Sequence, residues 1–300
     1  ISLILFVFIS SGMAATEKLN FTIATTHPTT LPWAALLRDY FVPVSSKRIE
    51  AIYPNIELEW HQAYGTLYKW QDSLNGLKIG LSDIGWVGSL WESSRLPLQN
   101  ITYDLPFITD VLSSRLSVMN DLHHDIPEMQ DSWSDNDLKF LAATGTDTYH
   151  LVTNFPIRTL ADLKGKKILA PGAASIWLEG TGATAVNGAL TTYYTQLKTG
   201  VADGAVTILS GAYPFRLHEV AQHITLVGIG AQFVGALAIN LEVWNHLTQP
   251  VQDVFLEVAR DYSRLSAEAA NQRYVEALEA LQNEGAILYT LPLVEKEKWM

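Results

Sequence analysis

The sequence contains no cysteine among its 300 residues. Disulfide bonds, cysteine nucleophiles and thiolate metal sites are therefore excluded. Basic residues are also scarce, with 20 Lys and Arg against 31 Asp and Glu, and the formal net charge is −11. This acidic balance argues against a nucleic acid or an anionic membrane surface as the partner of the protein.

Catalytic motifs are absent as well. The sequence has no G-x-S-x-G, no H-E-x-x-H and no P-loop. Residues 180–185, Gly-Thr-Gly-Ala-Thr-Ala, match the dinucleotide pattern, but a helix rather than the required strand is expected before them, so we interpret them as a turn. His123 and His124 have no E-x-x-H nearby and are expected at the surface. We predict that the protein is not an enzyme and holds no cofactor or metal.

Long apolar runs are rare. Residues 1–9 form a short one, and small residues suited to a cleavage site follow before Thr16. The run is too short to span a bilayer, so we predict a signal peptide over residues 1–15 whose basic start is missing from the sequence. The alternative is a buried first strand. A signal peptide predicts export to a bacterial periplasm.

What the chain does have is apolar residues, at 48%, and a length sufficient for two domains. Residues 19–24, 56–60 and 83–87 are predicted strands with helical patterns between them, which is the order of one doubly wound α/β half. The stretch Leu160 to Thr207 contains two further turn-to-strand units. Gly165 is placed to end a helical turn before Ile168, and a helix ends at Gly200 before the strand that begins near Asp203. Ligands of such units bind at the carboxyl ends of the strands.

The segments LADLKGKKILAPG (residues 160–172) and YYTQLKTGVADGA (residues 193–205) resemble the solute-binding subunits of tripartite ATP-independent periplasmic (TRAP) transporters, the DctP type. The resemblance implies a two-domain periplasmic-binding-protein fold with a ligand cleft between the domains and a TRAP membrane permease as partner. It implies a first domain of residues 16–146 plus 233–272 and a second of residues 147–232 plus 273–300. We expect the domains to close by a hinge near Thr146 and Phe233.

A long helix is predicted between Pro250 and Gly285, spanning on the order of 50 Å. The resemblance implies that it braces both domains. Its apolar face is predicted from residues at helical spacing. These are Val251, Val254, Phe255, Val258, Tyr262 and Leu265, continued by Val275, Leu278 and Leu281. Near its start, the segment 240–247 resembles the family pattern N-x-x-x-W/Y-x-x-L.

The sequence departs from the family at the residues that usually bind the ligand. The two family arginines fall on Leu169 and Tyr149, and the family asparagine falls on Thr207. A carboxylate buried without a guanidinium would carry a desolvation cost of several kcal/mol. The other candidate ligand-binding residues are Trp86, Trp177, Asp147, Tyr213 and His27. For the two tryptophans a core position and a pocket position both remain open.

These departures favour a small amine or amino alcohol, similar to ethanolamine, over a neutral polyol. Aromatic residues would hold the ammonium by cation–π contacts, and Asp147 or Glu179 would balance its charge. The alternative is an organic acid, such as a dicarboxylate or sugar acid, bound by a relocated Arg158 or Arg216. A small hydrolase or isomerase using Asp147 and His27 is the alternative of another class.

Overall fold

The computed structural model describes residues 17–300, and the predicted signal peptide lies outside this range. Within this range eleven strands form two sheets. The first sheet has the order β2-β1-β3-β10-β4 and the second the order β11-β9-β5-β8-β6-β7. The strands of the first sheet are β1 (Glu17–Thr25), β2 (Ile56–Tyr64), β3 (Ile84–Val87), β4 (Leu138–Thr146) and β10 (Gln232–Asn240). Those of the second are β5 (Tyr149–Thr153), β6 (Lys167–Ala170), β7 (Thr184–Asn187), β8 (Gly204–Ile208), β9 (His223–Leu226) and β11 (Ile287–Thr290).

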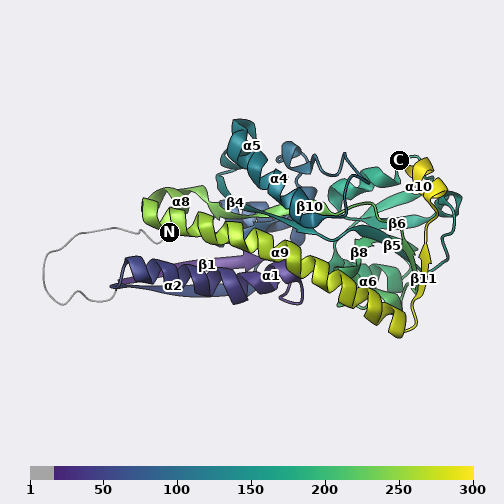
Figure 1. Cartoon of the computed structure of the whole chain (residues 1–300), viewed down its shortest axis with the longest axis horizontal. Helices are drawn as coiled ribbons and strands as arrows, with labels where there is room; N and C mark the ends of the chain where they lie inside the picture. Colours follow the sequence, from purple (N-terminus) through teal and green to yellow (C-terminus); the bar gives the residue numbers. More distant parts are fainter. Residues whose placement is uncertain (1–16) are drawn as a thin grey trace, which may run out of the picture.

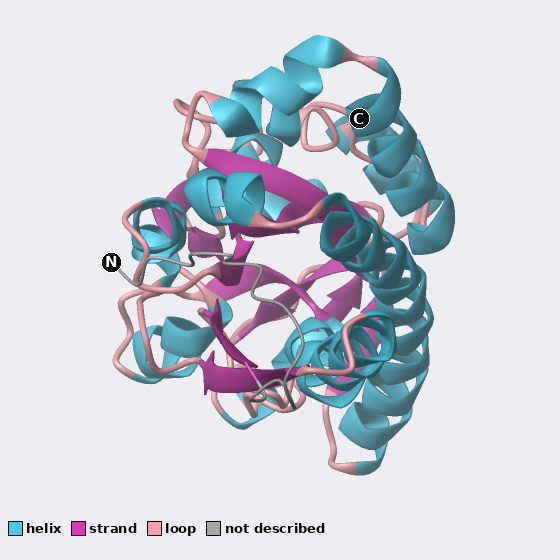
Figure 2. Ribbon diagram, turned by 90° about the vertical axis from the view of Figure 1, so that its left-hand side faces the viewer, coloured by secondary structure: helices cyan, strands magenta, loops and turns pink. Residues whose placement is uncertain are grey.

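Helices cover both sheets, and an end-on view shows the strands at the centre with helices around them (Figure 2). Within residues 17–300 none of these helices is both long and apolar enough to cross a membrane. The helices are α1 (Pro32–Leu36), α2 (Val42–Ile52), α3 (Ser73–Lys78), α4 (Leu112–Asp125), α5 (Pro127–Ser134), α6 (Leu190–Lys198), α7 (Leu209–Ala212), α8 (Leu241–His246), α9 (Gln249–Asn283) and α10 (Leu293–Trp299). Shorter helical turns include η3 (Ser89–Trp91) and η6 (Gly172–Leu178).

The predicted strand pairing around the stretch Leu160 to Thr207 is confirmed. β6 and β8 are parallel neighbours, with Ile168 opposite Gly204 and Leu169 opposite Ala205. Gly180 and Gly182 both have positive φ, so the dinucleotide-like segment is a turn. The backbone there passes through the left-handed region that glycine enters without steric cost. A nucleotide-binding loop is not formed.

The chain passes directly from one sheet to the other at two neighbouring points, and a third time through α9, which lies between β10 and β11 in the sequence. The first crossing lies between Thr146, the last residue of β4, and Tyr149, the first of β5. The second lies between Leu226 at the end of β9 and Gln232 at the start of β10. The strands of the first sheet therefore fall in the residues predicted for the first domain, apart from Gln232 itself. The chain runs in opposite directions through these two crossings, since β4 and β10 are antiparallel neighbours. We predicted a hinge at this place, where strands rather than a flexible linker join the domains.

The long helix α9 packs against β4, α1, α2 and α4 on one side of the crossings and against α7 on the other. Figure 1 shows it running past both sheets. Phe255 and Tyr262 are buried as predicted, but Val275 is 59% exposed. Beyond Tyr262 small side chains such as Ala267 and Ala270 turn toward the protein instead. The buried stripe drifts around the axis because 35 residues at 3.6 per turn do not keep one fixed repeat.

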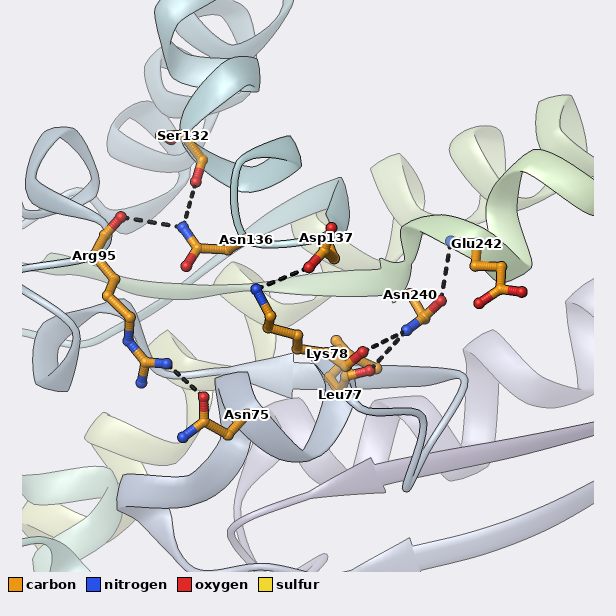
Figure 3. Close-up of polar contacts among 9 residues, drawn as sticks. All are labelled: Asn75, Leu77, Lys78, Arg95, Ser132, Asn136, Asp137, Asn240 and Glu242. Carbon is orange, nitrogen blue, oxygen red and sulfur yellow. Dashed lines mark hydrogen bonds and ion pairs between the residues drawn. The ribbon is translucent and has the colours of Figure 1, made fainter. Parts of the chain in front are cut away.

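A group of polar contacts joins the ends of several elements in the first domain (Figure 3). Asn240 occupies the N-cap of α8, where its Oδ1 accepts the N–H groups of Glu242 at 3.0 Å and Val243 at 3.2 Å. Its Nδ2 donates to the carbonyls of Leu77 and Lys78, each at 3.0 Å, at the end of α3. The asparagine of the family pattern therefore starts one helix and ends another. Nearby contacts join Lys78 to Asp137, Arg95 to Asn75, and Asn136 to Arg95 and Ser132.

We expect Asn240→Ala to lower the free energy of unfolding by about 2–3 kcal/mol. The cap contributes about 1 kcal/mol, and leaving the carbonyl of Lys78 without its asparagine partner costs about as much again or more, whereas the carbonyl of Leu77 keeps the N–H of Gly80. Urea denaturation followed by circular dichroism measures the change. Asn245→Ala in the same helix is the control, because Asn245 is exposed and should change stability by less than about 0.5 kcal/mol. Equal stability of the two variants would contradict the assignment.

Candidate functional site

A cavity of about 40 Å³ lies between the two sheets. It is placed where strands of both sheets end: Trp86 lies in β3, Thr146 ends β4, Pro171 follows β6 and Thr207 lies in β8. This is the position at which open α/β sheets bind ligands. The lining residues are His27, Trp33, Trp86, Leu90, Trp91, Thr146, Tyr149, Pro171, Leu190, Tyr193, Thr207, Ile208 and Val234.

Aromatic rings gather around His27 on the wall formed by the first domain. The centroid of the His27 ring lies 5.7 Å from that of Trp33, 5.6 Å from Trp86 and 6.2 Å from Trp91. Burial lowers the pKa of His27 to about 4, so its imidazole is neutral at pH 7. The indole N–H of Trp86 is already used, since it donates to Thr144 Oγ1 at 2.7 Å. This wall is therefore aromatic and uncharged.

Several buried polar atoms of the lining residues have no hydrogen-bond partner among residues 17–300. They are Trp33 Nε1, Thr146 Oγ1 and Tyr193 Oη. Burial raises the pKa of Tyr193 well above its usual range and that of Tyr149 to about 12, so both phenols keep their protons. An indole N–H can only donate, and a neutral phenol donates readily. The residues around the cavity thus carry buried donors for which a ligand with acceptor oxygens would be a partner.

Among the described residues that line the cavity none is a lysine, arginine, aspartate or glutamate. The two basic residues proposed for an acid lie elsewhere. Arg158 sits over the ring of Tyr289, with 4.9 Å between its Cζ and the ring centroid, and Arg216 pairs with Glu219. Glu179, proposed to balance an amine, is exposed. Neither predicted kind of charge partner reaches the cavity.

Four of the eight residues predicted to bind the ligand line this cavity together: His27, Trp86, Tyr149 and Thr207. Trp86 and Tyr149 are also almost completely buried, at 1% and 4% exposure. For Trp86, the sequence left open a core position or a pocket position, and the structure shows that it has both: it is buried and it lines the cavity. The other four predicted residues do not line it.

Leu169 and Trp177 are core residues next to the site. Leu169 is fully buried in the cluster that packs against α6. Trp177 lies behind Tyr149, with 5.2 Å between the ring centroids, and its indole N–H donates to the carbonyl of Tyr103 at 2.8 Å. For Trp177 the core position is therefore the observed one.

Asp147 and Tyr213 make structural contacts outside the cavity. The Asp147 carboxylate lies at the first crossing, where it accepts hydrogen bonds from the backbone N–H and the hydroxyl of Ser210. Burial raises the pKa of Asp147 to about 6, against the effect of these bonds. Tyr213 donates its hydroxyl to Glu284 at 2.7 Å, beside the end of α9. Both side chains have polar partners within the protein, and neither lines the cavity.

Trp91 and Tyr193 line the cavity but were not predicted from the sequence. Trp91 follows β3 by a few residues, and its indole N–H donates to the carbonyl of Gly188 at 3.3 Å, on the opposite domain. Tyr193 is the first residue of the YYTQLKTG segment and points from α6. Trp91 could have been predicted from the sequence, because it follows the end of a predicted strand, where ligands bind in α/β folds. Helical periodicity cannot separate a cavity tyrosine from a core one, so Tyr193 carried no such signal.

The comparisons with known proteins agree with this architecture. An extracytoplasmic solute receptor of Bordetella pertussis, described as binding pyroglutamic acid, matches with a TM-score of 0.80 at 16% identity over 94% of this chain and 90% of the other. A TRAP periplasmic solute-binding protein of Roseobacter denitrificans with bound β-D-glucuronate matches with a TM-score of 0.79 at 20% identity, over 94% and 91% of the two chains. The predicted two-domain α/β fold is confirmed.

Sequence relatives give the family. A solute-binding protein of Albidiferax ferrireducens is 26% identical over 147 residues, which is 48% of this chain and 44% of that protein. The family model of the bacterial extracellular solute-binding proteins, family 7, matches residues 53–300. That is most of the chain, and the family consists of solute-binding proteins rather than enzymes. The protein therefore belongs to the DctP family of bacterial extracellular solute-binding proteins, as its 160–172 and 193–205 segments indicated.

Proposed function

We propose that the protein is a periplasmic receptor that binds a small organic acid between its two domains and delivers it to a TRAP-type membrane permease. Family membership and the interdomain cavity support the receptor function. Export through a signal peptide in residues 1–15 is part of the same proposal. The observation that carries the ligand class is the set of unpartnered donors in the cavity wall, because donors need acceptor oxygens.

The acid replaces the amine that the sequence favoured. An ammonium in this cavity would have no carboxylate beside it, since no Asp or Glu is among the described residues that line it and Asp147 is bound to Ser210. Burying such an ion without a partner costs several kcal/mol. The ligands described for the B. pertussis and R. denitrificans receptors, pyroglutamic acid and glucuronate, are both acids. The alternative that the sequence left open is therefore the better supported one.

The cavity volume sets the expected size of the ligand in this conformation. One water molecule needs a cavity volume of about 10–15 Å³, so the cavity of about 40 Å³ has room for roughly three water molecules. That room suits a carboxylate of about three carbons, with its apolar part against the aromatic wall. Larger acids such as a hexuronate require the domains to stand further apart. We therefore place short monocarboxylates ahead of sugar acids.

Thermal denaturation with added ligand tests the proposal. L-lactate and L-pyroglutamate should raise the unfolding temperature, because binding to the folded state alone adds about 2.7 kcal/mol at 100 times the Kd. Ethanolamine and glycerol at the same concentration should leave it unchanged. Binding should also change the tryptophan fluorescence, since Trp33, Trp86 and Trp91 line the cavity. Stabilisation by ethanolamine while neither acid has an effect would contradict the acid proposal.

A further inference from the structure

Arg115 is a buried cation that does not line the cavity. It lies on α4, is 7% exposed, and its Nη1 donates to the carbonyl of Thr102 at 3.3 Å. Its Nη2 is buried and has no hydrogen-bond partner among residues 17–300, and no carboxylate in that range forms an ion pair with it. A guanidinium remains charged at neutral pH. A buried charge of this kind costs several kcal/mol unless an opposite charge meets it.

The surroundings of Arg115 lead toward the cavity. Tyr103 follows Thr102, and its ring stacks on Trp177 with 5.2 Å between centroids. Trp177 packs in turn against Tyr149, which lines the cavity. Tyr103 is 1% exposed, and its hydroxyl also forms no hydrogen bond within residues 17–300. Arg115, Tyr103 and Tyr149 are therefore three successive polar groups between α4 and the ligand site.

The pKa shifts of Tyr103 and Tyr149 indicate that Arg115 interacts with Tyr103 and that Tyr103 interacts with Tyr149. Burial raises the pKa of Tyr103 well above its usual range, and the guanidinium of Arg115 acts in the opposite direction. The side chains of Thr146 and Tyr103 both lower the pKa of Tyr149, against the larger effect of burial. Arg115 thus favours the ionised form of the Tyr103 hydroxyl, and Thr146 and Tyr103 favour that of Tyr149. Chains of donors polarised in this way strengthen the last donor.

We propose that Arg115 supplies the positive charge of the acid site through two tyrosine hydroxyls. Arg115 Nη2 donates to Tyr103 Oη, Tyr103 donates to Tyr149 Oη, and Tyr149 donates to the carboxylate of the ligand, with Thr146 beside it. Small side-chain adjustments on ligand binding complete the bonds. Arg115 acts as a positioning residue, because it reaches the ligand only through Tyr103 and Tyr149. The inference rests on the proposed acid ligand and names the residues that recognise its charge.

This arrangement gives the chain a different source of charge from the one its family resemblance implies. The family arginines fall on Leu169 and Tyr149, both in the second domain. Arg115 belongs to the first domain and lies on α4, between the buried Leu112 and Met119. An arginine within an apolar helical stripe is a sequence signal that identifies it. The carboxylate would then be recognised across the cleft, by a tyrosine of one domain backed by a cation of the other.

The test compares an acid with its uncharged amide. Calorimetry would measure the Kd of L-lactate and of L-lactamide for the wild type, Arg115→Met and Tyr103→Phe. We expect Arg115→Met to weaken lactate binding by about 30-fold or more while lactamide binding changes less than threefold. Tyr103→Phe keeps the cation and removes the connecting hydroxyl, so it should weaken lactate binding about fivefold. Circular dichroism and the unfolding temperature report whether each variant is folded.

The outcomes separate this inference from the proposed function. Equal weakening of lactate and lactamide in Arg115→Met would show a structural role and overturn the inference. Unchanged lactate binding in a folded Tyr103→Phe would do the same, and this variant decides the matter if Arg115→Met does not fold. A wild type that binds neither lactate nor pyroglutamate would instead contradict the acid ligand itself. Arg115→Lys, which keeps the charge, should retain part of the preference for lactate over lactamide.

Discussion

Acidification from pH 7 to pH 4 should lower the free energy of unfolding by about 7 kcal/mol, enough to unfold most domains. His27, His123 and His150 are 2–3% exposed, and burial lowers the pKa of each to about 4. The ordinary value is about 6.5, so each contributes stability that is fully present above pH 6.5 and is lost as the pH falls toward 4. One histidine accounts for about 3 kcal/mol, and the three together for about 10 kcal/mol.

The largest opposing contribution comes from Asp147, and the raised pKa values of the Asp83 and Glu92 carboxyl groups, also due to burial, act in the same direction. Burial raises its pKa to about 6, so the folded protein takes up a proton there before the unfolded chain does. Folding is therefore favoured by about 3 kcal/mol more at pH 4 than at pH 7 through this group alone. Between pH 6 and pH 4 the unfolded chain binds about two more protons than the folded protein. Stability should change by about 2.7 kcal/mol per pH unit in that window.

His150 shows why the folded protein excludes the proton. Its Nδ1 accepts the backbone N–H groups of Val227 and Gly228, each at 3.1 Å, at the second crossing between the sheets. Protonation of Nδ1 would break both bonds. Asp110 raises the pKa of His150 and Lys296 lowers it, but burial is the larger effect. His123 is similarly enclosed, with its ring stacked on Phe140 at 3.7 Å, so the predicted surface position of His123 is wrong.

Urea denaturation at pH 7, 6 and 5, followed by circular dichroism, measures the slope. His150→Gln removes one titrating group, so its slope should be about 1.4 kcal/mol per pH unit smaller than that of the wild type, whatever its stability at pH 7. His124→Gln is the control, because His124 is exposed and should leave the slope unchanged. A wild-type stability that stays constant between pH 7 and pH 5 would contradict the burial of neutral histidines.

Replacing Gly172 by alanine should weaken ligand binding by about tenfold to a hundredfold. Gly172 follows β6 in the second domain, and a Cβ atom there would lie 2.0 Å from the carbonyl oxygen of Leu90 in the first. Leu90 and Pro171 both line the cavity, so this contact sits at its rim. Relieving such an overlap costs about 1–3 kcal/mol. If the domains separate in the absence of ligand, this cost destabilises only the closed, ligand-bound conformation and therefore weakens binding. Closure by hinge motion thus becomes testable through one methyl group.

Gly180→Ala is the matched control. Gly172 and Gly180 both have positive φ, +49° and +76°, so each alanine variant carries the left-handed backbone strain of about 1–2 kcal/mol. At Gly180, however, a Cβ atom would meet nothing within 4 Å. Calorimetry with L-lactate should show near wild-type affinity for Gly180→Ala and a large loss for Gly172→Ala. Similar affinities for the two variants would mean that the approach of Gly172 to Leu90 is not needed for binding.

Several local features of this protein could be predicted from the sequence alone. Turn glycines and short apolar runs placed β6 and β8 correctly, because both signals act within a few residues. Helical spacing located α9 and its first buried residues up to Tyr262. Family motifs added the two-domain α/β fold and a long helix near the C-terminal end of the sequence. Within the cavity, residues at the strand ends, such as Trp86 and Thr207, were also found.

The tertiary structure decided which side chains meet. Leu169 and Pro171 are two residues apart, yet one packs against α6 and the other lines the cavity, because the strand ends between them. Trp91 and Tyr193 come from opposite domains and share the cavity only after folding. The fold also decides which charged side chains find a partner. Ser210 donates a hydrogen bond to Asp147, whereas Arg115 is buried without a carboxylate partner among the described residues. Periodicity and motifs report on neighbours along one element, whereas ligand contacts and desolvation are properties of segments that meet in space.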